Sequence, residues 1–363
     1  MMEVKVVERK FSELKSLGRF ADYEDPDRGL IDAESVADVF VSDPYLTDTE
    51  RTAQILGVVE NRIIGRISPF PLHVIADGAL YEGAAGMNLS VNPNFRKTGF
   101  AIDLIERLDA YSKDQIQVGY YVSRVARKMI GMMGDAVFSI RQFALVKRSA
   151  YLLGKRLPKW GRKIFCPVLD LIFFIHYAIL RLVVGLKTRG WKIEQVRSDD
   201  VHGIGQFVDM VKSDRFRFRQ SVDADFVQWA LRHDFETAGN WEKSLYRVSI
   251  GGKAVGFFLS RATLGDDRGR LLDWQTEQGW ERIVPWMLLK GALIQRHKVL
   301  ATVISVSATD SAVVKVLKWL LPPLPLQAAV IGAGPDSPLR HHDGWQEQRN
   351  WRLRPSMGDS VFY

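Results

Sequence analysis

Residues 88–108 read NLSVNPNFRKTGFAIDLIERL, and this stretch decides how the chain is expected to fold. The alternating apolar residues Leu89 and Val91 predict a strand that ends before Pro93. Gly99 then precedes apolar residues at helical spacing, which predicts a helix directly after a short loop. The first amides of a helix have no partner inside it and lie at its positive dipole end, so they bind phosphate groups well. The stretch therefore predicts a site for a nucleotide-type cofactor.

A weak internal repeat runs through the chain. Residues 58–65 (VVENRIIG) and 249–256 (SIGGKAVG) each predict a β-hairpin with a two-residue turn. The same order of strand, helix, strand and helix follows each hairpin. The matching segments are 84–91 with 271–275, 99–111 with 285–295, 116–122 with 301–306, and 124–133 with 311–320. This order predicts a mixed α/β fold that is present twice, with helices on the faces of a mixed sheet.

Length and composition suit two globular domains. The chain has 363 residues, of which 47% are hydrophobic and 25% charged. We expect a first domain at 1–150, a connector at 151–191 and a second domain at 192–363. The formal net charge of +8 favours anionic partners without choosing among them. A single cysteine, Cys166, excludes internal disulfides, and no metal-ligand spacing occurs, so no metal cofactor is expected.

The N-terminus and the aromatic residues give expectations about location and partners. The first ten residues are charged and lack the apolar core of a signal peptide, so a cytoplasmic protein is expected. Aromatic residues do not alternate with basic ones, so nucleic acid is not favoured as a partner. Contact with a membrane surface stays open and depends on the connector.

The connector contains a long apolar segment, residues 164–186, with basic residues on both sides. Its length would span a bilayer, but Asp170, His176 and Arg181 interrupt it. At helical spacing Lys163, Asp170, Phe174, Tyr177 and Arg181 share one stripe and the remainder is apolar. Pro167 suits the first turn of such a helix. We expect an amphipathic helix that braces the two domains or, as the second interpretation, lies on an anionic membrane.

The hexapeptide Arg96-Lys97-Thr98-Gly99-Phe100-Ala101 has the form R-x-x-G-x-A and follows a strand that ends in Val-Asn-Pro. It resembles the cofactor loop of the GCN5-related N-acetyltransferase superfamily, whose motif is Gln/Arg-x-x-Gly-x-Gly/Ala. The resemblance implies two tandem domains of that fold and acetyl-CoA, or another acyl-CoA, as the acyl donor. It also implies that the six loop residues hold the pyrophosphate and that Leu89 and Val91 lie against the pantetheine arm.

The chemistry that this resemblance implies is direct attack of an amine on the thioester. Glu82 is the only carboxylate on the 79–91 stretch and is the candidate base. The family's tyrosine is missing from residues 124–133, so the acid must come from elsewhere. Tyr120, Tyr121 and Ser123 are the candidates, although Ser123 also suits a helix cap. Cys166 has no His–acid constellation and is not expected to act as a nucleophile.

The second half lacks the R-x-x-G-x-A motif, and Pro285 and Trp286 stand where small residues would be needed. The expected function is therefore an N-acyltransferase with one cofactor site. Its acceptor would be an amine such as an amino sugar or a glycan precursor, since the layout loosely resembles bacterial two-domain acyltransferases associated with surface polysaccharides. Two alternatives remain open: a non-catalytic acyl-CoA-binding or membrane-scaffolding protein, and an aminoacyl-tRNA-dependent transferase of the same fold.

Overall fold

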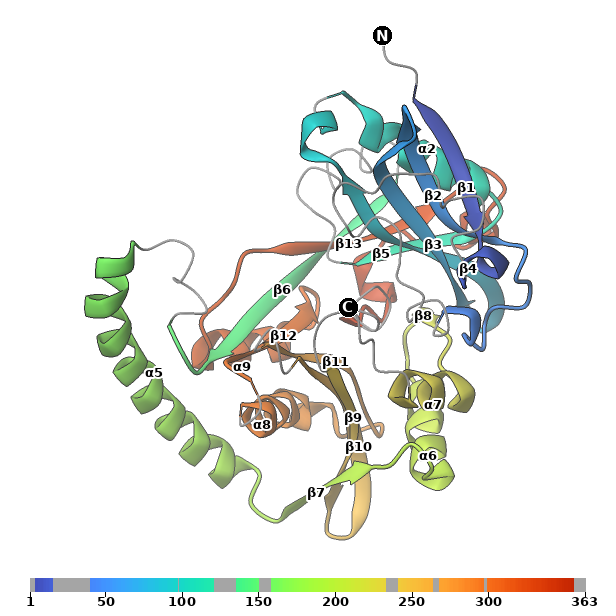
Figure 1. Ribbon diagram of the computed structural model, residues 1–363. Helices are drawn as coiled ribbons and strands as arrows, with labels where there is room; N and C mark the ends of the chain where they lie inside the picture. The colour runs from blue at the N-terminus through green and yellow to red at the C-terminus, as the bar shows by residue number, and fades with distance from the viewer. Residues whose placement is uncertain are drawn as a thin grey trace.

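The computed structural model describes residues 4–15, 40–96, 98–120, 135–149, 158–232, 241–263, 268–296 and 299–355. One mixed sheet runs through the whole molecule (Figure 1), in the strand order β1-β2-β3-β4-β5-β13-β6-β12-β11-β10-β9-β7. The first half contributes β1 (Lys5–Lys10), β2 (Thr52–Val59), β3 (Arg62–Ala76), β4 (Ala79–Val91), β5 (Ile116–Tyr120) and β6 (Ala136–Val146). The second contributes β7 (Trp191–Val196), β9 (Trp241–Ile250), β10 (Lys253–Thr263), β11 (Arg268–Thr276), β12 (Ala301–Ser307) and β13 (Gln327–Ala333). The short strand β8 (Phe218–Gln220) pairs with β3.

Both predicted hairpins are present. Glu60 and Asn61 turn β2 into β3 with φ angles of 48° and 60°. Gly251 and Gly252 turn β9 into β10 with φ angles of 60° and 82°. Two successive positive φ angles give the turn whose twist matches that of the flanking strands. The order of elements after each hairpin also follows the predicted repeat, apart from the expected helix at 124–133, which lies outside the described residues.

The two halves exchange a strand. β13 of the second half pairs with β5, and β6 of the first half pairs with β12. β13 and β6 also pair with each other and so join the halves. The mixed sheet is confirmed, but it is continuous across the expected domain boundaries near 150 and 192.

The helices cover the two faces of this sheet. α2 (Phe100–Tyr111), α8 (Val284–Gln295) and α9 (Ser311–Leu320) pack on one face. α6 (Val201–Lys212) and α7 (Ala224–Arg232) pack on the other, together with a C-terminal segment at 337–355. The buried core on this second face contains residues of both halves, such as Tyr120 and Trp351, which makes the halves one packing unit.

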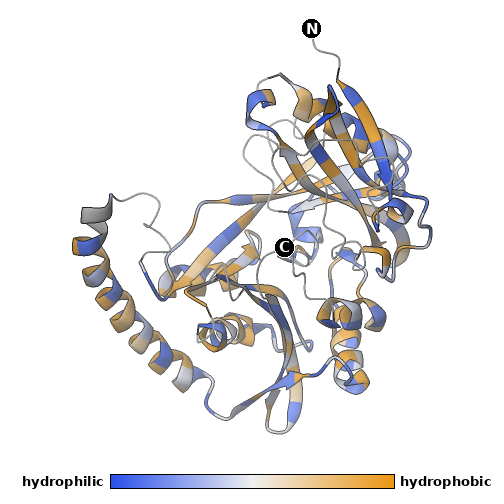
Figure 2. Ribbon diagram, viewed as in Figure 1, coloured by the Kyte–Doolittle hydropathy of each residue, from blue (hydrophilic) through white to orange (hydrophobic). Residues whose placement is uncertain are grey.

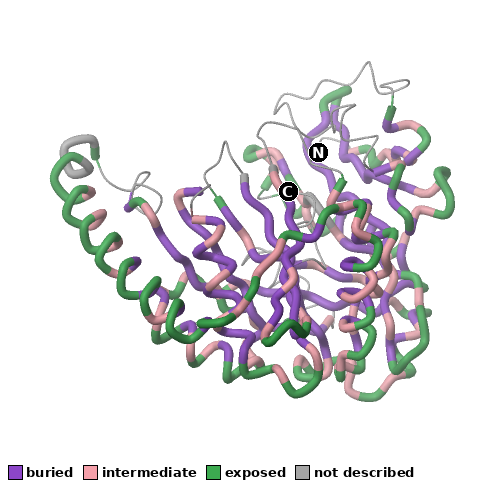
Figure 3. Tube along the Cα trace, turned by 90° about the horizontal axis from the view of Figure 1, so that it is seen from below, coloured by how far each residue is buried: buried purple, intermediate pink, exposed green. Residues whose placement is uncertain are grey.

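The connector forms the long helix α5 (Lys159–Lys187), which stands at the edge of the molecule (Figures 1 and 3). Pro167 lies inside this helix, so its predicted place in the first turn is wrong. The helix begins earlier than the apolar segment does. Tyr177, Leu180 and Val184 are its buried residues, and they pack with α8, α9 and the second-half strands. α5 thus contacts the second half over a larger part of its length, and among the described residues it meets the first half through β6, Arg148 and Ser149.

Candidate functional site

β4 and β5 run parallel and then separate. Gly83, Ala84 and Ala85 pair with Ile116, Gln117 and Val118. β4 continues to Val91 without a strand partner on its β5 side among the described residues. A bulge accompanies the separation, since Arg66 pairs with Ser90 whereas Ser68 pairs with Met87, which leaves one extra residue on β4. From Gly86 to Ser90 the β5 side of β4 therefore has no strand partner among the described residues, and we call this stretch the open edge of β4.

The loop after β4 is held by its own hydrogen bonds. The Asn92 amide donates to the Ile64 carbonyl at 2.7 Å, and the Asn92 side chain accepts from the amide of Asn94 at 3.0 Å. Arg96 turns back, and its Nε donates to the Val91 carbonyl at 2.9 Å. Gly99 precedes α2 with a φ angle of +87°, in the region that favours glycine. This conformation lets the chain turn directly into the helix, so the predicted strand–loop–helix unit is confirmed.

α2 is seated on the sheet by one aromatic ring. Phe100, its first residue, is buried against Gly57 of β2 and Gly65 of β3, which face each other across the hairpin. A Cβ atom on Gly57 would lie 1.8 Å from the Phe100 ring, and one on Gly65 would lie 2.7 Å from it. Leu104 and Leu108 continue this contact one and two turns later. This packing fixes the position of the first backbone amides of α2, those of Phe100 and Ala101.

The other residues predicted to bind the cofactor have different positions relative to the loop. Val91 is buried beneath α2, and Leu89 packs against the same cluster. The open edge of β4 therefore presents backbone groups rather than these two side chains. The Thr98 hydroxyl donates to the Phe95 carbonyl at 2.7 Å and stabilises the loop. Lys97 lies outside the described residues.

Of the predicted catalytic residues, Tyr120 and Glu82 lie on opposite sides of the point where β4 and β5 pair. Tyr120 is buried two residues beyond Val118, where the strands have separated. Glu82 precedes the paired residues, is exposed, and its Oε2 lies 3.3 Å from Nη1 of Arg51. The structure therefore does not bring Glu82 and Tyr120 together. Both roles stay predictions, and Ser123 and Tyr121 lie outside the described residues.

A buried carboxyl that the sequence did not single out lies on the Tyr120 face. Burial raises the pKa of Asp43 to about 7, with a smaller rise from Asp223, although its hydrogen bond from the Tyr45 amide lowers it. That bond measures 2.7 Å. The neighbouring Phe40 and Tyr45 belong to the same core as Tyr120. A group that titrates near neutrality suits proton transfer, but no pattern in the sequence around Asp43 indicates its burial.

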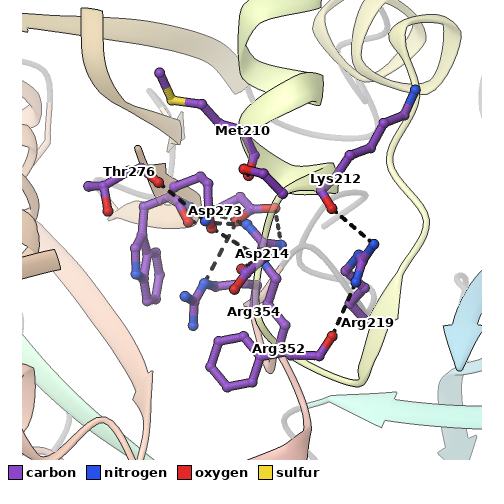
Figure 4. A network of polar contacts seen from close by, with 12 residues as sticks. Met210, Lys212, Asp214, Arg219, Asp273, Thr276, Arg352 and Arg354 are labelled. Carbon is purple, nitrogen blue, oxygen red and sulfur yellow. Dashed lines mark hydrogen bonds and ion pairs between the residues drawn. The ribbon is translucent and has the colours of Figure 1, made fainter. Parts of the chain in front are cut away.

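The second half repeats the separation of strands but closes it. Arg268–Leu271 pair with Ala301–Ile304, and beyond this point β11 continues without a strand partner on its β12 side among the described residues. Arg352 fills the gap (Figure 4): its Nη2 lies 2.5 Å from the Asp273 carboxylate and 3.1 Å from the Trp274 carbonyl. Its Nε lies 3.0 Å from Asp214, so this fully buried guanidinium is paired twice. The backbone edge that the first half leaves open is thus occupied here.

The start of α8 also differs from the start of α2. Pro285 stands at its first turn, where it removes a backbone N–H, and no R-x-x-G-x-A loop precedes it. The second half therefore lacks the features expected of a phosphate loop, and phosphate binding by the first-half loop stays a prediction.

A polar pocket of about 370 Å³ remains beside Arg352 in the second half. Its lining includes Arg215, Gln275, Glu281, Asp310 and Arg354. The Arg354 Nη1 atom lies 3.4 Å from Asp310 at the start of α9. The sequence could not indicate this pocket, since its walls come from segments that lie far apart along the chain.

The strand pairings show how far the pocket lies from Tyr120, next to the open edge of β4. Tyr120 pairs with Ala329, and Ala329 pairs with Phe138. Two residues further along β6, Ile140 pairs with Ser307. Tyr120 and Ser307 therefore lie in neighbouring parts of the sheet, about 16 Å apart over three strand spacings and two residues along β6. The two separated strand pairs face the same central region.

Comparison with known proteins identifies the fold. No protein-family model matches the chain, and no curated protein matches it in sequence. N-myristoyltransferase of Saccharomyces cerevisiae with bound myristoyl-CoA is similar in structure, with a TM-score of 0.57 and 13% identity over 92% of this chain and 84% of that one. A GCN5-related N-acetyltransferase from Kribbella flavida gives 0.50 and 13%, covering 91% and 71%. A probable N-acyltransferase from Enterococcus faecalis gives 0.50 and 12%, covering 93% and 74%. The chain therefore has the mixed α/β fold of these N-acyltransferase structures.

Proposed function

We propose that the protein is an N-acyltransferase that binds acyl-CoA in its first half and transfers the acyl group to an amine. The observation that carries this proposal is the separation of β4 from β5 after Ala85 and Val118, with Gly99 and α2 at its end. The open edge of β4 suits the amide groups of a pantetheine arm, and the first amides of α2 suit a pyrophosphate. Myristoyl-CoA is bound in one of the similar structures, which supports the same class of donor.

In the proposed reaction the lone pair of the acceptor amine attacks the thioester carbonyl. The C–N bond forms, the C–S bond breaks, and CoA leaves as a thiolate that takes up a proton. A base must accept the proton that the amine loses. Tyr120, in the separated region, is the described residue we propose as the proton donor to sulfur. The class of acceptor, an amino sugar or glycan precursor in our proposal, rests on the sequence resemblance alone.

The donor site is tested by calorimetry with acetyl-CoA and myristoyl-CoA on the wild type and Gly99→Trp. We expect the substitution to weaken binding at least about tenfold, because a large side chain at the loop blocks the approach of the pyrophosphate. Gly78→Trp is the matched control, since Gly78 also has a φ angle of +87° and a Cβ atom added to either glycine would have nothing within 4 Å. Both variants carry the same backbone strain, but only Gly99 borders the loop. Absence of binding by the wild type, or equal loss in both variants, would overturn the assignment.

Catalysis is tested separately, by release of free CoA thiol over a panel of amines. Thiol release that depends on the amine supports the transferase. Tight binding without release over the whole panel would favour the non-catalytic alternative.

We further propose that the polar pocket in the second half receives the acceptor. The pocket lies in a part of the sheet that neighbours Tyr120. Exposed Arg215 and Glu281 line it and suit a polar molecule. Arg215→Ala is expected to raise the acceptor KM about tenfold and leave the Kd of acyl-CoA unchanged, because it removes one charged contact. Arg282→Ala removes the same charge from an exposed position that does not line the pocket, and serves as the control. Equal kinetics for the two variants would contradict this placement.

A further inference from the structure

Three polar or aromatic side chains hold α5 on the protein. The Asp170 carboxylate accepts a hydrogen bond from the Ser149 amide at 2.6 Å, and His176 Nε2 lies 2.7 Å from the Leu320 carbonyl. The Arg296 guanidinium lies 3.4 Å from the centre of the Tyr177 ring. Asp170 and Tyr177 of the polar stripe, together with His176, therefore contact residues that follow β6 and α8 and the last residue of α9, whereas Lys163, Phe174 and Arg181 of the stripe are exposed. A helix on the surface of a water-soluble protein normally turns its apolar side towards the protein.

Exposed apolar residues recur along α5 from Ile164 to Leu186, where orange segments alternate with blue ones in Figure 2. Ten large hydrophobic side chains on α5 are between 51% and 66% exposed. They are Ile164, Phe165, Val168, Leu171, Ile172, Phe174, Ile175, Ile179, Leu182 and Leu186. We call this set the outward face. From Ile164 to Leu186 it is about 33 Å long at the helical rise per residue. A contiguous exposed apolar surface of this kind is typical of a site that binds a membrane or another protein.

Basic residues flank the outward face. Lys163, Arg181, Lys187 and Arg189 are exposed along and beyond the helix, against one acidic residue, Asp170, that is already held by Ser149. Trp319 of α9 is 78% exposed and adjoins Leu320, the residue that contacts α5. An amphipathic aromatic ring and cationic side chains around an apolar surface fit the boundary between lipid headgroups and acyl chains.

We propose that α5 lies parallel to an anionic membrane, with its outward face in the lipid and with Asp170, His176 and Tyr177 held by the protein. The geometry goes beyond the acyl transfer proposed above and does not depend on it. Basic residues would meet anionic headgroups, and the apolar side chains would enter the upper part of the acyl region.

Two other arrangements fit the observations less well. By length and composition, Lys163–Lys187 is the one described helix that could cross a membrane, with a mean hydropathy of 2.0. Crossing would require the contacts of Asp170, His176 and Tyr177 to be given up. A second copy packed antiparallel on the same face would place Lys163 of one chain near Lys187 and Arg189 of the other, with no acidic residue to pair them.

The test is flotation of the full chain with vesicles of phosphatidylcholine alone and with about one third phosphatidylglycerol. We expect the wild type to float with the anionic vesicles, less with the neutral ones, and less again at high salt. Ile175→Asp/Leu182→Asp, two changes on the outward face, is expected to reduce the bound fraction at least about tenfold. Leu80→Asp/Val201→Asp is the matched control, since these residues are 58% and 66% exposed on other elements. Thermal unfolding of both variants checks that they are folded.

Each other outcome would overturn the proposal. Failure of the wild type to float with any vesicle, or equal loss in both double variants, would show that the outward face does not bind lipid. A wild-type dimer that the outward-face variant converts to a monomer, without any change in flotation, would identify a second copy as the occupant. Resistance of the membrane-bound protein in cells to extraction at high pH would show that α5 crosses the bilayer instead of lying on it.

Discussion

Phe100 links the predicted loop to the sheet beneath it. Its ring occupies the space that Gly57 and Gly65 leave open on two neighbouring strands. Neither glycine needs an unusual backbone conformation here; each is required because a side chain would meet the ring. The position of the loop is therefore set by residues more than 30 positions earlier in the chain, and a change there should reach the donor site.

Gly57→Ala is expected to lower the free energy of unfolding by about 1–3 kcal/mol, because its Cβ overlaps the Phe100 ring. We also expect weaker binding of acyl-CoA, since α2 must shift to relieve the overlap. Urea unfolding and calorimetry measure the two effects. Adding Phe100→Leu to Gly57→Ala should recover part of the stability, because the smaller side chain leaves room for the Cβ. Unchanged stability and binding in Gly57→Ala would contradict this account.

Other residues of the site show which contacts local sequence patterns can predict and which they cannot. The loop from Arg96 to Ala101 was predictable because the turn and the helix start depend on neighbours in sequence. The pairing of Arg352 with Asp273 was not, because the two lie 79 residues apart. Likewise, alternation places Tyr120 on one of two faces, and only its pairing with Ala329 shows which elements surround it.

At the scale of elements, helical periodicity predicted that α5 forms but not how it is oriented on the protein. Helical spacing predicted the helix and grouped Asp170, Tyr177 and Arg181 on one stripe. It could not predict which side faces the protein, because helical spacing shows which residues share a side but not what that side contacts. The preference for an inter-domain brace assumed that apolar residues turn inward. Among the residues of this helix whose burial is described, three are buried against ten large exposed hydrophobic ones, so that assumption was wrong.

The hairpins illustrate the opposite case. Glu60–Asn61 and Gly251–Gly252 adopt positive φ angles for local reasons, so their sequences were sufficient to predict them. β6 and β13 were not predicted, and their partners lie in opposite halves of the chain. Strand pairing over such distances has no local signature. The repeat was therefore readable from the sequence, whereas the exchange that joins its two copies was not.

At the scale of the whole molecule, this exchange makes the halves depend on each other. Four strand interfaces among the described residues, β5–β13, β13–β6, β6–β12 and β3–β8, are formed between residues of different halves. A second tie lies on the sheet face, where Asp77 of the first half contacts Arg217 at 2.6 Å and His342 at 2.8 Å. Among the described strands, cutting the chain into halves would leave β6 and β13 without any partner from their own half.

We therefore expect fragments 1–155 and 156–363 to fail to fold when expressed separately and to assemble when expressed together. Each fragment alone exposes unpaired strand edges and part of the shared core, which favours aggregation over folding. Co-purification and a single cooperative thermal transition, followed by circular dichroism, would demonstrate assembly. The matched control is the full chain with a protease site after Lys155, cleaved once folded, which should keep the transition of the intact protein. A monomeric fragment with a sharp transition of its own would contradict this prediction, because it would mean that one half forms a complete core without the exchanged strand.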